Sequence, residues 1–423
     1  MNRSTLFYSV VLLSGTMAEP ALAAHGSRPA AASSASRVAT PIRNHQAHPD
    51  AKCGRCSGSV GKTSASRTTK EVHTANGGRA TLGKDGHNHH GPDGVRESRR
   101  ERPDHSPIGG HGYTERSYSY HGHEFAHRTY YLHGVAYSRF YQPYRYRGIE
   151  FHVYAPGFYY APAFYGWAYS PWATPVAWEW GWARHPWYRY YGAWFRPYPV
   201  YSSPSLWLTD YLVAQTLEAA YEARIDAAAD AAAKRRAQAA DLASSPMLPE
   251  VKQAVAEEVR RQLALEHAEA RNSGQNPPDP GSSGLARMLG DGISHVFVVA
   301  TGLEVKSSVG ACSITEGDVI QLNGPTAPNA VTANLVVLAN KGNDCPKGST
   351  VTVGLADLQE MQNHMRATID QGLGELHSKQ GKGGLPAVPA AAAKPPVATE
   401  FAAIAPPPDP NSEAEIAQQA VWR

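Results

Sequence analysis

The 423-residue chain lacks several sequence signatures of common enzyme classes. It contains no nucleophile elbow, no phosphate-binding glycine loop, and no acidic pair in a recognisable catalytic context. Beyond the N-terminus, no apolar run reaches the roughly 20 residues that a membrane-spanning helix needs. We therefore expect no cofactor and no membrane span in the mature chain. The same absences favour a protein that is not an enzyme.

Cysteine is scarce, with four residues in the whole chain. Cys312 and Cys345 flank the middle of a β-rich segment and are predicted to form a disulfide, because an even cysteine count in an oxidising compartment favours pairing. Closing a loop of that length stabilises by about 3–4 kcal/mol in the chain-entropy model. Cys53 and Cys56 have redox spacing without a strand–helix context. A local disulfide is the preferred interpretation, and a redox role stays open.

The N-terminus has the three parts of a secretory signal peptide. Arg3 supplies positive charge, Leu6–Leu13 is a short apolar core, and Ala21-Leu22-Ala23 is a small-residue cleavage site. We expect residues 1–23 to be removed and the protein to be secreted or periplasmic, in the cell envelope. An uncleaved anchor is the alternative.

Large apolar side chains are nearly absent from residues 24–110, so we expect this arm to be disordered. The arm carries 14 Lys and Arg against seven Asp and Glu. Such a charge could suit RNA, but export argues against nucleic acid and favours anionic envelope polymers. The histidine cluster His87, His89 and His90 could bind a metal loosely, or belong to a polar spacer.

Lysine is absent from Tyr113–Tyr201, which holds 19 of the 22 tyrosines and seven of the nine tryptophans. One interpretation is an aromatic platform that presents flat rings to sugars or to proline-rich peptides. The other is that the rings pack on one another and on the following helices as an irregular core, because so many exposed aromatics would cause aggregation. The candidate platform residues are Trp167, Trp172, Trp178, Trp180, Trp182 and Trp187.

A literal H-E-x-x-H motif begins at His123, with Glu124 and His127 in the other two positions and His133 where zinc proteases of the metzincin type place a third ligand. Such proteases need the motif on a helix, and Tyr130 replaces the glycine of their pattern. The residues around it favour strands and a hairpin turn instead. A zinc hydrolase using His123, His127 and His133 is therefore an alternative hypothesis, as is a His-rich metal-binding protein.

Hydrophobic periodicity predicts the regular elements. Strands are expected at 128–132, 135–141, 148–154, 295–300, 319–322, 333–339 and 349–353. Helices are expected from Pro204 to about Leu242, from Glu250 to Arg271, and from Leu355 onward. The first two helices should form a hairpin that packs on the aromatic block, with a coiled-coil oligomer as the alternative. Residues 155–201 have too many prolines and glycines for long elements and should be extended and turning.

These elements indicate an α+β chain of several segments. The expected order is a signal peptide (1–23), a disordered arm (24–110), an aromatic block with β-hairpins (111–201), a helical pair (202–271), a linker (272–284), a small β-barrel with a C-terminal helix (285–378) and a disordered Pro/Ala-rich tail (379–423).

Two stretches carry a resemblance to known families. The segment ITEGDVIQLNG, Ile314–Gly324, resembles the glycine–aspartate turn of bacterial SH3-like barrels, which implies binding of peptides or cell-wall material. The order of a signal peptide, a block such as PAFYGWAYSPWATP, the helix entry at PYPVYSSPSLWLTDYLVAQTLEAAY and a terminal barrel is similar to that of uncharacterised secreted bacterial envelope proteins. That resemblance covers residues 128–378 and implies architecture and export. We expect a binding or structural protein whose partners are polysaccharide, peptidoglycan, a membrane surface, a peptide or an envelope protein.

Overall fold

The computed structural model describes residues 70–73, 79–83, 86–90, 96–98, 113–120, 122–132, 135–227, 246–272, 278–308, 310–322, 324–342 and 344–405. The chain divides into two units, Met1–Ala65 and Ser66–Arg423, and every described residue belongs to the second. The signal peptide, Cys53, Cys56 and most of the basic arm therefore lie outside the described residues. The described part is a mixed α+β structure with antiparallel sheets, as the sequence predicts.

The first sheet has eight antiparallel strands that follow one another in chain order. They are β1 (Lys70–His73), β2 (Arg79–Gly83), β3 (Gly86–His90), β4 (Arg96–Ser98), β5 (Tyr113–Tyr120), β6 (His123–Leu132), β7 (Val135–Tyr146) and β8 (Ile149–Ala155). The three strands predicted here are confirmed as β6, β7 and β8. Arg147 and Gly148 have positive φ angles of 51° and 80° and form the two-residue turn between β7 and β8.

Short helices interrupt the aromatic block after the two-residue strand β9 (Phe158–Tyr159). They are α1 (Pro162–Tyr169), the 3-10 turn η3 (Trp182–Arg184) and α2 (Pro186–Tyr191). The expectation of extended, turning backbone throughout this block is therefore wrong for these segments. Proline occupies the first turn of α1 and α2, where its missing N–H costs no hydrogen bond, so here it starts a helix instead of preventing one.

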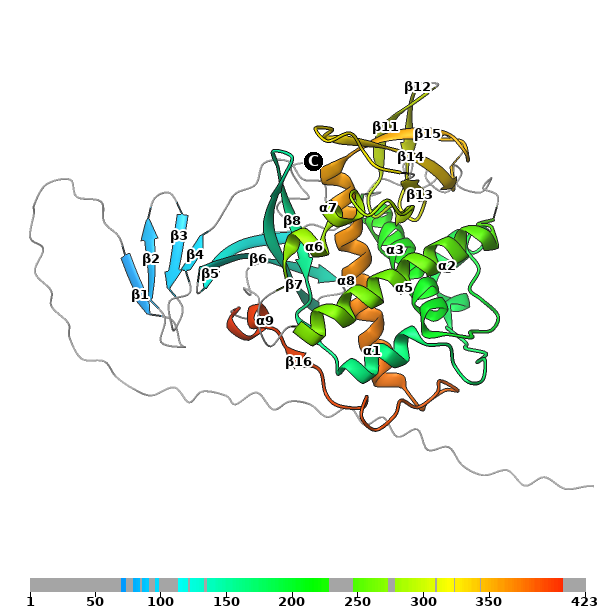
Figure 1. Ribbon diagram of the computed structural model, residues 1–423, viewed down its shortest axis with the longest axis horizontal. Helices are drawn as coiled ribbons and strands as arrows, with labels where there is room; N and C mark the ends of the chain where they lie inside the picture. Colours follow the sequence, from blue (N-terminus) through cyan, green and yellow to red (C-terminus); the bar gives the residue numbers. More distant parts are fainter. Residues whose placement is uncertain are drawn as a thin grey trace, which may run out of the picture. The chain divides into compact units, whose positions relative to one another are not determined.

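Three long helices form the centre of the main core: α3 (Pro204–Ala227), α5 (Pro249–Asn272) and α8 (Leu355–Lys379). Their predicted starts are confirmed, while residues 228–245, where the first helix was expected to end, lie outside the described part. Helix α3 packs on both α5 and α8, and α8 also packs on β8 (Figure 1). The predicted linker contains the short helix α6 (Pro280–Ser283), which α7 (Leu285–Met288) follows.

The second sheet has six strands in the order β10-β13-β14-β15-β11-β12. Their bounds are β10 (His295–Val298), β11 (Leu303–Ser307), β12 (Gly310–Ile314), β13 (Val319–Leu322), β14 (Thr332–Ala339) and β15 (Thr350–Gly354). All four predicted strands are confirmed, and β11 and β12 were not predicted. The SH3-like barrel is not confirmed, because no pairing within the described strands joins β10 to β12 and closes the sheet. The predicted disulfide between Cys312 and Cys345 is confirmed.

Part of the C-terminal tail packs on the rest of the chain. Strand β16 (Val397–Ala398) pairs with β9, and helix α9 (Glu400–Ile404) follows it. Phe401 is buried against Phe125, with ring centroids 5.0 Å apart. The expectation of a disordered tail is therefore wrong for these residues. The buried side chain of Phe401 holds this alanine-rich segment against the sheet.

Candidate functional site

The six candidate platform tryptophans do not form an open surface. Trp172, Trp182 and Trp187 are buried, and the other three are half-buried. The rings of Trp180 and Trp182 stack with centroids 4.1 Å apart. Trp180 also lies against Trp207 of α3, at 4.4 Å between centroids. In the structure these rings pack on one another and on helix α3, which is the second of the two sequence interpretations.

A buried ion pair lies beneath this aromatic packing. Lys252 Nζ is 2.6 Å from Asp210 Oδ1, and Tyr201 donates its hydroxyl hydrogen to Asp210 Oδ2 at 2.7 Å. Lys252 Nζ also lies over the ring of Tyr198, 3.6 Å from its centroid. The pair joins α5 to α3 and fixes the loop that leads into α3, so it holds the fold together.

The H-E-x-x-H motif lies on strand β6 and not on a helix. Successive strand residues point to opposite faces, so Glu124 faces away from the side that His123 and His127 share. His123 is exposed, whereas His127 is 4% exposed and stacks on Phe140 at 5.1 Å between ring centroids. Burial lowers the pKa of His127 to about 4. The side chain of His133 lies outside the described residues, and no group of metal-binding side chains occurs within the described part.

The site that the structure favours is a groove of about 380 Å³, which we call the β7–α8 groove. Its walls come from β6, β7, β8, helix α8, the segment around β9, and the tail helix α9. The lining residues are His127, Tyr137, Ser138, Arg139, Phe140, Tyr154, Gly157, Phe158, Tyr160, Ala367, Asp370, Gln371, Ala402 and Ala405. Pockets of about 300–1,000 Å³ commonly hold small ligands or parts of larger ones.

The groove exists because β8 is shorter than β7. The last pair between the two strands joins Phe140 to Ala155, after which the chain turns away toward β9. Residues 135–139 of β7 still pair with β6, but no described strand pairs with their other edge. A stretch of strand edge is thereby left along one wall of the groove.

Exposed aromatic rings flank the opening. Phe158 is 53% exposed and Tyr137 is 36% exposed, the two largest exposures among the groove's rings. Arg139 lies beside them, with its guanidinium 5.0 Å from the centroid of the Tyr130 ring. The groove therefore offers apolar faces next to a cation.

An acidic group forms the inner wall. Asp370 Oδ2 accepts a hydrogen bond from the hydroxyl of Tyr154 at 2.7 Å, and the carboxyl of the fully buried Glu266 interacts electrostatically with that of Asp370. Burial raises the pKa of both carboxyls, that of Glu266 well above its usual range. Burial thus disfavours the charged form of both carboxyls, and Asp370 is the one of the two that lines the groove.

A second cavity, of about 350 Å³, is lined by polar side chains that include Glu124, Arg145 and Glu150. Next to it, the fully buried Arg128 forms two ion pairs. Its Nε lies 2.6 Å from Glu115 Oε2, and its Nη1 lies 3.0 Å from Glu360 Oε2. Although burial opposes it, contacts with His152 and Arg128 hold the pKa of Glu115 below its usual range. These partners tie the sheet to α8 and favour a structural role for this region.

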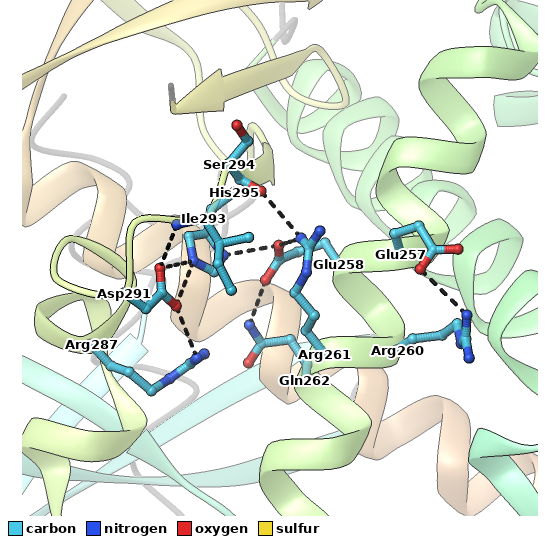
Figure 2. Close-up of polar contacts among 10 residues, drawn as sticks. All are labelled: Glu257, Glu258, Arg260, Arg261, Gln262, Arg287, Asp291, Ile293, Ser294 and His295. Carbon is cyan, nitrogen blue, oxygen red and sulfur yellow. Dashed lines mark hydrogen bonds and ion pairs between the residues drawn. The ribbon is translucent and has the colours of Figure 1, made fainter. Parts of the chain in front are cut away.

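A third polar cluster joins helix α5 to the second sheet, as Figure 2 shows. Both ring nitrogens of the buried His295 face carboxylates, with Nδ1 3.1 Å from Glu258 Oε2 and Nε2 3.0 Å from Asp291 Oδ2. Arg261 Nη1 lies 2.6 Å from the same oxygen of Glu258. Each charge has a partner of opposite sign, so this cluster also stabilises the fold.

Sequence reasoning missed the groove residues Tyr137, Arg139, Phe158 and Asp370. A signal for Asp370 exists in α8, whose polar residues recur at helical spacing on a face adjoining the apolar stripe. That polar stripe, buried except at its last member, is Gln359, Gln362, Asn363, Arg366 and Asp370. By pattern alone such a stripe indicates a solvated face, because sequence does not show which polar side chains find buried partners.

The chain matches no known protein-family model, and it has no significant similarity to a curated protein or to a solved structure. The resemblance to secreted envelope proteins thus gains no support from these comparisons and stays a prediction. Among the described helices, none is long and apolar enough to cross a membrane.

Proposed function

We propose that this protein is an exported, non-enzymatic binding protein of the cell envelope, and that the β7–α8 groove contacts an envelope polymer such as polysaccharide or peptidoglycan. The observation that carries the proposal is the placement of two exposed rings, Phe158 and Tyr137, at a groove that also holds Arg139 and Asp370.

This combination suits a saccharide or peptide polymer. Flat aromatic rings bind the C–H faces of sugars and apolar side chains, and a few charged groups fix the ligand's orientation. Tyr160 and Gln371 add hydroxyl and amide groups to the same groove. The disulfide between Cys312 and Cys345 agrees with an oxidising compartment.

The groove's acidic pair supports binding in preference to hydrolysis. The two carboxyls of a glycosidase stand about 5–9.5 Å apart, on either side of the scissile bond. Glu266 is instead fully buried and does not line the groove, so only the carboxyl of Asp370 faces a ligand. The second sheet would serve as a separate interaction module, as the expected SH3-like resemblance implies.

Retention of the mature protein on insoluble cell wall tests this proposal. We expect the wild-type protein to sediment with the cell wall and the double variant Tyr137→Ala, Phe158→Ala to lose at least tenfold in apparent affinity. Tyr169→Ala is the matched control, because Tyr169 is 42% exposed on α1 and does not line the groove. Equal retention of the wild-type protein and the double variant would contradict the proposal.

A further inference from the structure

The turn between β7 and β8 determines toward which neighbouring strand the N–H and C=O groups of each β7 residue point. Tyr146 and Ile149 flank the two-residue turn at Arg147 and Gly148, and residues that flank such a turn exchange both backbone hydrogen bonds. Hydrogen bonding alternates along an antiparallel strand, so every second residue from Tyr146 faces β8. The last of these that pairs with β8 is Phe140.

The same alternation continues beyond the end of β8. Ser138 and Ala136 have the parity of Phe140, so their N–H and C=O groups point toward the edge that no described strand covers. Tyr137 and Arg139 have the other parity and bond to β6. The register between β6 and β7 runs without a shift from the pair Leu132 and Val135 to the pair Ala126 and Tyr141, so the alternation is not interrupted along this part of β7.

We propose that this free edge binds an extended peptide, which pairs as an added strand with Ser138 and Ala136 while its side chains enter the β7–α8 groove. Unpaired N–H and C=O groups on a strand edge form a template for another strand, and peptide recognition often uses this mode. Ser138 is exposed and lies in the groove wall, so the template is accessible from the groove.

The chain already uses this mode next to the groove. Val397 and Ala398 of its own tail pair antiparallel with Tyr159 and Phe158 of β9, and Thr399 N–H donates to Gly157 O at 2.9 Å. Phe401 then inserts into an aromatic socket beside Phe125 and Phe140. The surface next to the groove thus already binds an added strand whose following aromatic side chain inserts into a pocket.

A peptide backbone explains the groove better than a glycan does. The amides of a glycan strand are pendant N-acetyl groups, one on each sugar, whereas the backbone of an added strand about 4.8 Å away matches the edge of β7 residue by residue. Side chains of the added strand would alternate, so every second one faces the apolar wall of Phe140 and Phe158. The ligand class is therefore an extended peptide with an apolar side chain at that position.

This inference rests on the proposed function for its envelope ligand, and a proline substitution tests it. Ser138→Pro removes the N–H that faces the free edge and leaves the β6 ladder intact, because proline is tolerated at outward-facing edge positions. Ser138→Ala keeps the N–H and is the matched control. The probes are peptidoglycan with its stem peptides and glycan strands from which an amidase has removed them.

We expect wild type and Ser138→Ala to bind intact peptidoglycan, Ser138→Pro to bind at least tenfold more weakly, and all three to lose binding to the stripped glycan. Should Ser138→Pro misfold, amide hydrogen exchange of Ala136 and Ser138 in the wild-type protein gives the answer, because an added strand protects these two amides. Binding to stripped glycan with no effect of Ser138→Pro would overturn the inference and leave the proposed function intact.

Absence of binding to either material would overturn the proposed function, and the edge is then tested with a random heptapeptide phage library. Peptides that bind wild type and Ser138→Ala at least tenfold better than Ser138→Pro would support the inference. No such enrichment would overturn it. A wild-type dimer that Ser138→Pro converts to monomer would also overturn it, because the edge would then pair with a second copy of the chain.

Discussion

His295 Nδ1 lies 3.1 Å from Glu258 Oε2, with both side chains fully buried between helix α5 and strand β10 (Figure 2). Burial alone would lower the pKa of His295, but its hydrogen bonds to Glu258 and Asp291 raise it above its ordinary value. Burial likewise opposes ionisation of Glu258, and the contacts with His295 and Gln262 lower its pKa. Both shifts favour the charged forms of His295 and Glu258 in the folded protein.

We predict that stability falls as the pH rises above neutrality. The stabilisation from charged His295 is fully present below the unfolded-state pKa of about 6.5 and is lost as the pH rises through the higher folded-state pKa. His295→Gln should lower the free energy of unfolding by about 1.5–3 kcal/mol at pH 6, because it removes the charged hydrogen-bond donor between Glu258 and Asp291, while Arg261 still pairs with Glu258. Thermal unfolding of the wild-type protein and the variant between pH 5 and pH 9 measures how the difference in their stability changes with pH. A difference between the two proteins that does not shrink toward high pH would refute the prediction.

The Asp210–Lys252 pair gives a second prediction. Lys252→Met should destabilise by about 3–5 kcal/mol, because it leaves the carboxyl of Asp210 buried without its cation. The double variant Asp210→Asn, Lys252→Met should recover part of this loss, since neither charge remains. Urea unfolding of the two single variants and the double variant measures the coupling. Additive losses would show that the two side chains do not act as a pair.

A glycine in α8 marks the closest approach to α3. A Cβ at Gly372 would lie 2.6 Å from Leu208 Cδ2 and 2.9 Å from Tyr211 Cδ1. Gly372→Ala should therefore destabilise by about 1–3 kcal/mol, although alanine gains roughly 1 kcal/mol of helix propensity. Gly374→Ala is the control two positions along, where the nearest atom is the hydroxyl oxygen of Tyr160 at 3.3 Å. We expect that variant to match or exceed wild type in melting temperature.

Removing the disulfide should lower stability without abolishing the fold. The bridge joins cysteines 33 positions apart, and closing such a loop contributes about 3–4 kcal/mol in the chain-entropy model. The variant Cys312→Ser, Cys345→Ser should melt at a lower temperature and be insensitive to reductant. Wild-type protein in reductant should approach the melting temperature of this variant, and a wild-type melting temperature unchanged by reductant would contradict the prediction.

Sequence periodicity predicted the elements whose buried residues repeat regularly. Helix α5 has Val251, Val255, Val259 and Leu263 buried along one face, as the pattern indicated. Strand β11 was not predicted from the sequence, because only Val305 of this strand is buried, while Glu304 and Lys306 are exposed. A single buried residue is not a periodic signal, so pairing with β12 and β15 decides that this segment is a strand.

The candidate site was harder to predict than the fold. Sequence drew attention to dense tryptophans and to a histidine motif, yet neither shows whether a ring faces solvent or a neighbouring ring. The groove depends instead on where β8 ends relative to β7, and on the tail residues Ala402 and Ala405 that complete its wall. The tail lies more than 200 positions from these strands in the sequence, so no local pattern encodes its contact with them.

The stacked pair Trp180 and Trp182, together with Trp207, gives this protein a built-in optical reporter. Most of the chain's indoles lie in or against one cluster, so near-ultraviolet circular dichroism and intrinsic fluorescence will follow the aromatic block. Far-ultraviolet signal will instead follow α3, α5 and α8. A mismatch between the two melting curves would reveal an intermediate in which the helices persist after the rings have separated.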